Sequence, residues 1–153
     1  MSEPTHPVYT VQIVIDSQHP HSLADWWAAA IGWQVEPQDE GFIRRIIEQG
    51  FATEDDTLRH QGKLMWAAGS AIRHPDDQAG APRILFQAVP EPKTVKNRVH
   101  LDLRTDQQPS SEEVDRLLAA GASRYGGGQQ GPLSWVTLTD PEGNEFCLPT
   151  PSR

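Results

Sequence analysis

The chain repeats one pattern of predicted secondary structure, and this repeat limits its fold more than any other feature. Residues 12–16 and residues 100–104 are short alternating runs typical of β-strands. Each run is followed by an amphipathic helix, over residues 22–31 and 110–120, and then by further strand-like segments. Because the order strand, helix, strands occurs twice, we predict two related units of mixed α+β structure.

The strand-like segments that follow each helix are short and rich in β-branched and aromatic residues. They cover residues 32–36, 63–73 and 83–89 in the first half and residues 122–125, 135–139 and 144–148 in the second. The glycines at 126–128 are expected to form a flexible turn. Residues 90–97 read as an extended polar connector whose lysines, Lys93 and Lys96, either attract an anionic substrate or are simply solvated.

The two halves differ by one insertion. Residues 39–62 have no counterpart in the second half, and they contain apolar residues at helical spacing, Phe42, Ile43, Ile46 and Ile47. We therefore predict an inserted helical segment that either covers a cleft or packs under the sheet edge. Each half alone is too small to bury a large core. We expect one domain over residues 1–153, with repeat one over 8–90 and repeat two over 97–149.

Charge and cysteine content restrict the function further. The formal net charge of −8 makes the average surface repel phosphate backbones, which argues against nucleic acid as a partner. No apolar run approaches the roughly 20 residues that span a bilayer. The single cysteine, Cys147, excludes an internal disulfide, and the N-terminal residues do not read as an export signal. We expect a cytoplasmic protein that binds neither nucleic acid nor membrane.

Alternation within the strands predicts which side chains share a polar face. In residues 98–104 the apolar residues alternate with polar ones that include His100. Gln12 and Glu145 also stand on the polar side of strands whose other side is apolar. A curved sheet would bring Gln12, His100 and Glu145 together. The other interpretation is that they form an ordinary hydrogen-bonded polar surface.

Two stretches of sequence resemble a known family. They are Asn97-Arg98-Val99-His100-Leu101-Asp102-Leu103 and Asp140-Pro141-Glu142-Gly143-Asn144-Glu145-Phe146-Cys147-Leu148, the second of which begins with a predicted β-turn. Together with the paired units they resemble the vicinal oxygen chelate superfamily, most closely the glyoxalase-like domains related to glyoxalase, bleomycin-resistance proteins and extradiol dioxygenases. The resemblance implies an α+β fold of two βαβββ repeats whose curved mixed sheets enclose a cleft.

The resemblance also implies a metal site. Its ligand positions fall on Gln12, His100 and Glu145, while the remaining position falls on Leu85, which cannot ligate. Gln87, on the same face of that strand, could take this position only if the register shifts. This set would hold a divalent ion such as Ni, Zn, Mn or Fe, and Glu145 would also be the catalytic residue that moves a proton. The alternative is a metal-free polar patch.

Two functions follow from the resemblance. The first is a metal-assisted lyase or isomerase that acts on a small oxygenated substrate. The second is a binding protein that sequesters a drug or antibiotic without turnover, and the acidic composition suits a cationic ligand. In either case we expect a homodimer with a small-molecule ligand. The residues expected to contact that ligand are Trp33, Trp66, Phe86, Gln87 and Trp135.

Overall fold

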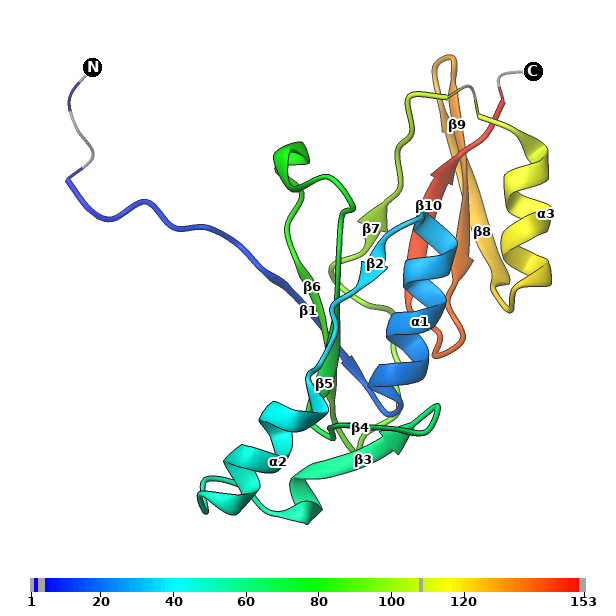
Figure 1. The fold of residues 1–153 in the computed structure, drawn as a ribbon. Coiled ribbons are helices and arrows are strands. Elements are labelled where there is room, and N and C mark those ends of the chain that lie inside the picture. Colours follow the sequence, from blue (N-terminus) through cyan, green and yellow to red (C-terminus); the bar gives the residue numbers. More distant parts are fainter. Residues whose placement is uncertain (1, 3–4, 108, 152–153) are drawn as a thin grey trace. The chain divides into compact units, whose positions relative to one another are not determined.

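The computed structural model describes residues 2, 5–107 and 109–151. It divides into two compact units, unit 1 up to Ala88 and unit 2 from Val89 (Figure 1). Each unit combines a four-stranded sheet, curved and unclosed, with helices. The predicted α+β class is therefore confirmed. None of the helices in the described residues is long and apolar enough to cross a bilayer.

The helices and the strands of the main sheets follow the predicted order, whereas the segment predicted over 63–73 divides into two strands, and the strand Thr57–His60 was not predicted. Unit 1 contains β1 (Ile13–Ser17), α1 (Pro20–Ile31), β2 (Gln34–Val35), α2 (Glu40–Glu48), β3 (Thr57–His60), β4 (Lys63–Trp66), β5 (Gly69–Arg73) and β6 (Ile84–Ala88), with short 3-10 helices at Glu54–Asp56 and Asp77–Ala79. Unit 2 contains β7 (Leu101–Asp102), α3 (Ser111–Ala119), β8 (Ser123–Gln130), β9 (Leu133–Thr139) and β10 (Glu145–Pro149).

The two main sheets have the same topology. Their strand orders are β1-β6-β5-β2 and β7-β10-β9-β8. In each sheet the first strand of the unit lies parallel to the last strand, and the last strand pairs antiparallel with the one before it. A parallel pair requires a long crossover, which the helix and the intervening strands supply. The repeat read from the sequence thus corresponds to two units of one design.

Helix α1 begins at Pro20, so the predicted start at Ser22 was wrong. Proline suits the first turn because that turn needs no N–H donor and its φ is already helical. The helix ends as predicted at Gly32, whose φ of 72° is left-handed. Its buried face, which includes Leu23 and Trp27, packs against β5 and β6.

The insertion contains the predicted helix, and its end forms a hairpin that was not predicted with β4, the first part of the strand-like segment predicted over 63–73. Asp39 caps α2 by accepting the N–H of Phe42 at 2.9 Å, and the helix packs against β4. Strands β3 and β4 form a separate two-stranded sheet joined at Gln61 and Gly62, whose φ values of 51° and 79° are left-handed. Figure 1 shows α2 in cyan and the hairpin in green at one end of unit 1.

In unit 2 the glycines at 126–128 lie within strand β8, so the predicted turn was wrong. They pair with β9, where a Cβ at Gly128 would stand 2.4 Å from the ring of Trp135. The glycines thus leave room for the indole over the strand. The strand predicted over 98–104 is shorter than expected, because β7 covers Leu101–Asp102 and Val99 is 81% exposed.

Candidate functional site

Unit 1 contains a cavity of about 410 Å³ on the face of β5 and β6 opposite the core. Ile84 and Phe86 are buried, whereas Leu85 and Gln87 alternate with them and face the cavity. The volume lies within the range of small-molecule sites. The cavity is lined by Glu36, Pro37, Gln38, Trp66, Ala68, Gly69, Ser70, Ala71, Arg83, Leu85 and Gln87.

The backbone of Trp66 is fixed on both sides by buried or half-buried side chains. Its N–H donates to Oε1 of Gln38 at 2.8 Å, and its carbonyl accepts from Nε2 of His21 at 2.8 Å. The Nε2 atom must carry the imidazole proton in this bond. Gln38 also donates to the carbonyl of Gly69 at 2.9 Å, which ties β4 to β5. Strand β4, which pairs with the end of the insertion, therefore supplies an aromatic wall of the cavity in a fixed position.

One rim of the cavity carries an ion pair. Arg83 donates to both carboxylate oxygens of Glu36 at 2.8–2.9 Å. The Arg83 guanidinium holds the pKa of Glu36 below its ordinary value. Arg83 also donates to Oε1 of Gln12 at 2.9 Å, so the amide oxygen of this predicted metal ligand already accepts a hydrogen bond. Gln12 precedes β1 and is exposed.

The predicted ligand-contacting residues separate into different places. Trp66 and Gln87 line the cavity. Phe86 is fully buried on the opposite face of the sheet, where it belongs to the core. Trp33 lies beside His74, with ring centroids 5.7 Å apart. In unit 2, Trp135 pairs in register with Pro149. The cavity thus contains two of the five.

The polar face of unit 2 follows the predicted alternation. Phe146 and Leu138 are fully buried partners on the apolar side. On the other side Glu145 pairs with Thr139, and Cys147 pairs with Thr137. The register of β10 with β7 also places Cys147 opposite Asp102.

Glu145 is a buried carboxylate neutralised by the connector that precedes β7. Its side chain is 2% exposed, and Oε1 lies 2.9 Å from Nζ of Lys93. Oε2 accepts the N–H of Asn97 at 3.2 Å, and Nζ of Lys96 lies 3.9 Å away. Burial by itself raises the pKa of Glu145, but the Lys93 ammonium and the backbone N–H groups outweigh this effect and hold the pKa below its ordinary value.

The turn before β10 fixes Glu145 in place. Asp140 accepts backbone N–H groups from Glu142 and Asn144 at 2.9 and 3.0 Å, and Gly143 takes a φ of 90°. The N–H of Gly143 donates to the carbonyl of Asp140 at 2.9 Å, which confirms the predicted β-turn. Asn144 then accepts from the side-chain amide of Asn97 at 2.9 Å. The turn and the connector together enclose the carboxylate.

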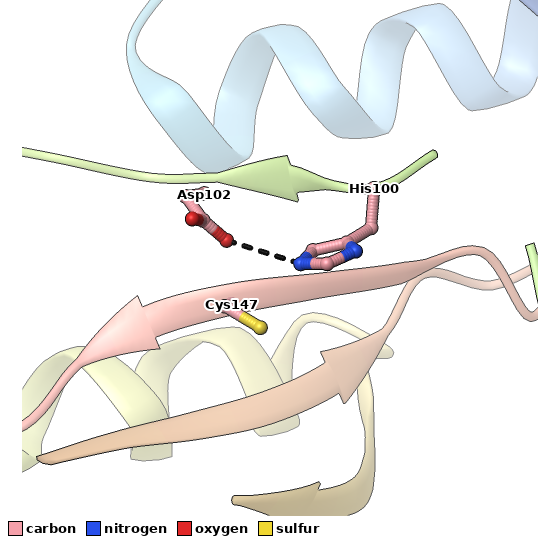
Figure 2. Close-up of side chains that lie close together, drawn as sticks. All are labelled: His100, Asp102 and Cys147. Carbon is pink, nitrogen blue, oxygen red and sulfur yellow. Dashed lines mark ion pairs between the residues drawn. The ribbon is translucent and has the colours of Figure 1, made fainter. Parts of the chain in front are cut away.

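A second polar group lies further along the same strands. His100, Asp102 and Cys147 bring one ligand atom each to within 4.8 Å of one another, and Figure 2 shows their side chains on the side of the sheet away from α3. Nε2 of His100 is 3.3 Å from Oδ1 of Asp102. Sequence reasoning found His100 but missed this group, and it also missed the role of Lys93. The alternation that puts Cys147 on the polar face was the available signal.

The sequence pattern of the glyoxalase-like domain family matches residues 12–149. The chain belongs to the glyoxalase-like domain family. This result confirms the resemblance to the vicinal oxygen chelate superfamily. The family includes enzymes and bleomycin-resistance binding proteins. None of the curated proteins matches the sequence of this glyoxalase-like protein.

Solved structures agree on the fold. A glyoxalase/bleomycin resistance protein/dioxygenase family enzyme from Burkholderia phytofirmans PsJN aligns over 91% of this chain and 95% of its own, with 16% identity and a TM-score of 0.52. A bleomycin resistance determinant encoded on transposon Tn5 aligns over 94% and 98%, with 14% identity and a TM-score of 0.52. A hypothetical protein from S. aureus aligns over 95% of both chains, with 13% identity and a TM-score of 0.54. At such identities the likeness concerns the fold alone.

Proposed function

We propose that this glyoxalase-like protein binds a small organic molecule in the cavity of unit 1 and does so without a divalent metal at Glu145. The ion pair between Lys93 and Glu145 is the observation that carries the proposal. The family positions for metal ligands are Gln12, Leu85, His100 and Glu145, and as they stand they do not fit a divalent ion.

The electrostatic argument concerns Glu145. A divalent ion at this carboxylate would stand close to the ammonium of Lys93, which is 2.9 Å from Oε1. At a separation of 4 Å and an effective dielectric constant of 20, a double and a single positive charge repel by about 8 kcal/mol. The ion could bind only if Lys93 moved away, and Glu145 would then lose a hydrogen bond. Lys93 thus neutralises the Glu145 carboxylate, which a metal ion would otherwise do.

The other family positions support the same conclusion. Leu85 has no donor atom and lines the cavity instead. The amide oxygen of Gln12 accepts from Arg83 at 2.9 Å. His100 keeps an imidazole that is 41% exposed, which by itself makes a weak metal site.

The cavity lining indicates the chemical class of the ligand. Trp66 and Leu85 offer apolar surface, and Gln87 offers an amide. The Glu36–Arg83 pair at the rim offers both a carboxylate and a guanidinium. A planar organic molecule with one polar or cationic group fits this combination. We extend the proposal to the whole chain acting as one domain, because the family match runs through both units. We also extend it to a homodimer, which sedimentation would test.

Ligand titration with and without chelator tests the proposal. Tryptophan fluorescence would be followed while bleomycin and a set of planar aromatic amines are added. We expect saturable binding that a chelator leaves unchanged. Leu85→Trp, which fills the cavity, should weaken binding at least about tenfold. The matched control is Gln34→Ala, because Gln34 is an exposed residue of β2 outside the cavity.

The competing function is the metal-assisted lyase or isomerase in which Glu145 moves the proton. About one ion per chain in protein purified without a histidine tag, lost in Glu145→Gln, would favour that enzyme and contradict the metal-free proposal. Binding abolished by the chelator would contradict it as well.

A further inference from the structure

We propose that His100, Asp102 and Cys147 of unit 2 form a binding site for a divalent transition metal ion of the zinc class. Asp102 and Cys147 come from the parallel strand pair of the unit, and His100 directly precedes β7 (Figure 2). None of the family ligand positions other than His100 takes part. The inference does not rest on the proposed function, because it concerns a different set of residues from the cavity and from Glu145.

The spacing of the ligand atoms suits a tetrahedral ion. With Zn–N and Zn–O bonds of about 2.0–2.2 Å, two ligand atoms of a tetrahedral zinc ion lie about 3.3 Å apart. Nε2 of His100 and Oδ1 of Asp102 are separated by 3.3 Å. A Zn–S bond of about 2.3 Å places the sulfur about 3.6 Å from the other two ligands. Since all three atoms already lie within 4.8 Å, Cys147 needs a shift of about 1 Å, within reach of a side-chain rotation.

The strands set the positions of two ligands. Asp102 and Cys147 are register partners on β7 and β10. Partners in a parallel pair project from the same face of the sheet. His100 directly precedes β7, and its imidazole lies 3.3 Å from the Asp102 carboxylate on that same face. The backbone therefore holds all three ligands close together before an ion binds, which reduces the conformational entropy that the site loses on binding.

The donor set determines the class of ion. One thiol, one imidazole and one carboxylate are typical of zinc and its chemical neighbours, whereas magnesium and calcium prefer oxygen ligands alone. The thiol gives up its proton when it coordinates, and a thiolate with a carboxylate neutralises a divalent charge. The Thr137 hydroxyl lies 3.3 Å from Sγ of Cys147 and can donate to the thiolate as an outer contact. His100 and Asp102 are 41% and 60% exposed, which leaves an entry path and a position for water.

The single cysteine of the chain makes the test unambiguous. The untagged full chain would be titrated with Zn²⁺ against a chromophoric chelator. It would then be loaded with Co²⁺ to look for a thiolate-to-cobalt charge-transfer band. In parallel, the reaction rate of Cys147 with a thiol reagent would be measured with and without Zn²⁺. We expect one ion per chain, the charge-transfer band, and protection of the thiol by Zn²⁺.

Variants then identify the ligands. Cys147→Ser and Asp102→Asn should each weaken Zn²⁺ binding at least about tenfold. Glu112→Gln is the matched control, since it changes an exposed carboxylate of α3 in the same unit that this site does not use. It should change the affinity less than about threefold, well below the effect of losing a ligand.

The outcomes separate this inference from the proposed function. If Zn²⁺ binding is lost in Glu145→Gln but kept in Cys147→Ser, the zinc site and the metal-free function are both overturned. The ion would then occupy the family position. No Zn²⁺ binding by the native chain, or no protection of the thiol, would overturn the zinc site and leave the cavity proposal intact. If Zn²⁺ binding is lost in Cys147→Ser while binding of the organic ligand in the cavity is unaffected by the chelator, the zinc site and the proposed function are both supported.

Discussion

Replacing Lys93 by methionine tests how the protein holds a buried carboxylate. The variant keeps most of the side-chain volume but leaves Glu145, which is 2% exposed, without its ammonium partner. The carboxyl can always take up a proton instead. At pH 7 that costs about 1.4 kcal/mol for each pH unit above its ordinary pKa of 4.5, or about 3.4 kcal/mol in all. This figure is therefore the largest cost of leaving the carboxylate without a partner, and the stabilisation that the pair gives the native chain is lost in addition.

We expect the variant to lose about 2 to 3 kcal/mol of unfolding free energy at pH 7. The cost of the unpartnered carboxylate stays below its limit of about 3.4 kcal/mol because Asn97 still donates to it, and the lost stabilisation is modest because Lys93, at 19% exposure, is itself partly hydrated.

The pH dependence of the loss has a definite sign. In the native chain the pKa of Glu145 lies below its ordinary value, so its contribution to stability is present above pH 4.5 and is lost as the pH falls through the lowered pKa. In the variant the unpartnered carboxyl has a raised pKa, and the destabilisation shrinks as the pH approaches 4.5. At pH 5 the cost of the unpartnered carboxyl is at most about 0.7 kcal/mol.

Urea unfolding followed by circular dichroism at pH 5, 6 and 7 would measure the loss. Lys96→Met is the control, because Nζ of Lys96 is 3.9 Å from Glu145 and the side chain is 38% exposed. It should cost less than about 0.5 kcal/mol. The double variant Lys93→Met/Glu145→Gln should recover part of the loss. A loss in Lys93→Met that is below about 0.5 kcal/mol, or equal at pH 5 and pH 7, would refute the reasoning.

Three further predictions concern unit 1. Gln38→Met removes the hydrogen bonds to the backbone of Trp66 and Gly69. It should lower the free energy of unfolding in urea by about 1–3 kcal/mol and weaken ligand binding. Unchanged stability would contradict this prediction. Gly69→Ala would place a Cβ 2.3 Å from a backbone oxygen of β6. Thermal unfolding should then show that the free energy of unfolding falls by more than about 2 kcal/mol, and a smaller decrease would disprove the close approach. Glu36→Gln breaks the pair with Arg83 and should cost up to about 1 kcal/mol at pH 7. Because the pKa of Glu36 is lowered, the Glu36→Gln difference should close as the pH falls below 4.5, and a pH-independent difference would count against it.

The sequence predicts the helices, the turn before β10 and the repeated topology well, because these features depend on local sequence patterns. Apolar spacing and a serine at position 110 mark α3, and the cap at Ser110 is present. The turn at 140–143 follows from Pro141, whose fixed φ suits the second position of a turn, and from Gly143, whose φ of 90° few other residues adopt easily. The repeat itself predicts that both units share one topology.

Features that depend on distant partners were missed. The glycines at 126–128 look like a turn in isolation, and only Trp135 on the neighbouring strand explains why they are extended. Lys93 looks like a solvated connector residue, because its partner Glu145 lies far along the chain and is itself buried by the fold. The hairpin of β3 and β4 has mixed polar strands whose pairing outweighs weak local propensity.

The pairing of each unit's first strand with its last determines how well the unit tolerates inserted residues between these strands. Closing the loop that joins β1 to β6, which includes the insertion, costs only about 0.4 kcal/mol more than closing the shorter one between β7 and β10, because the entropy grows with the logarithm of length. A helix and a hairpin could therefore be added to one unit almost without loss of stability. For protein engineering, the insertion and the strand β4 that follows it form a replaceable cassette that carries Trp66 to the cavity, and new binding segments could be grafted there.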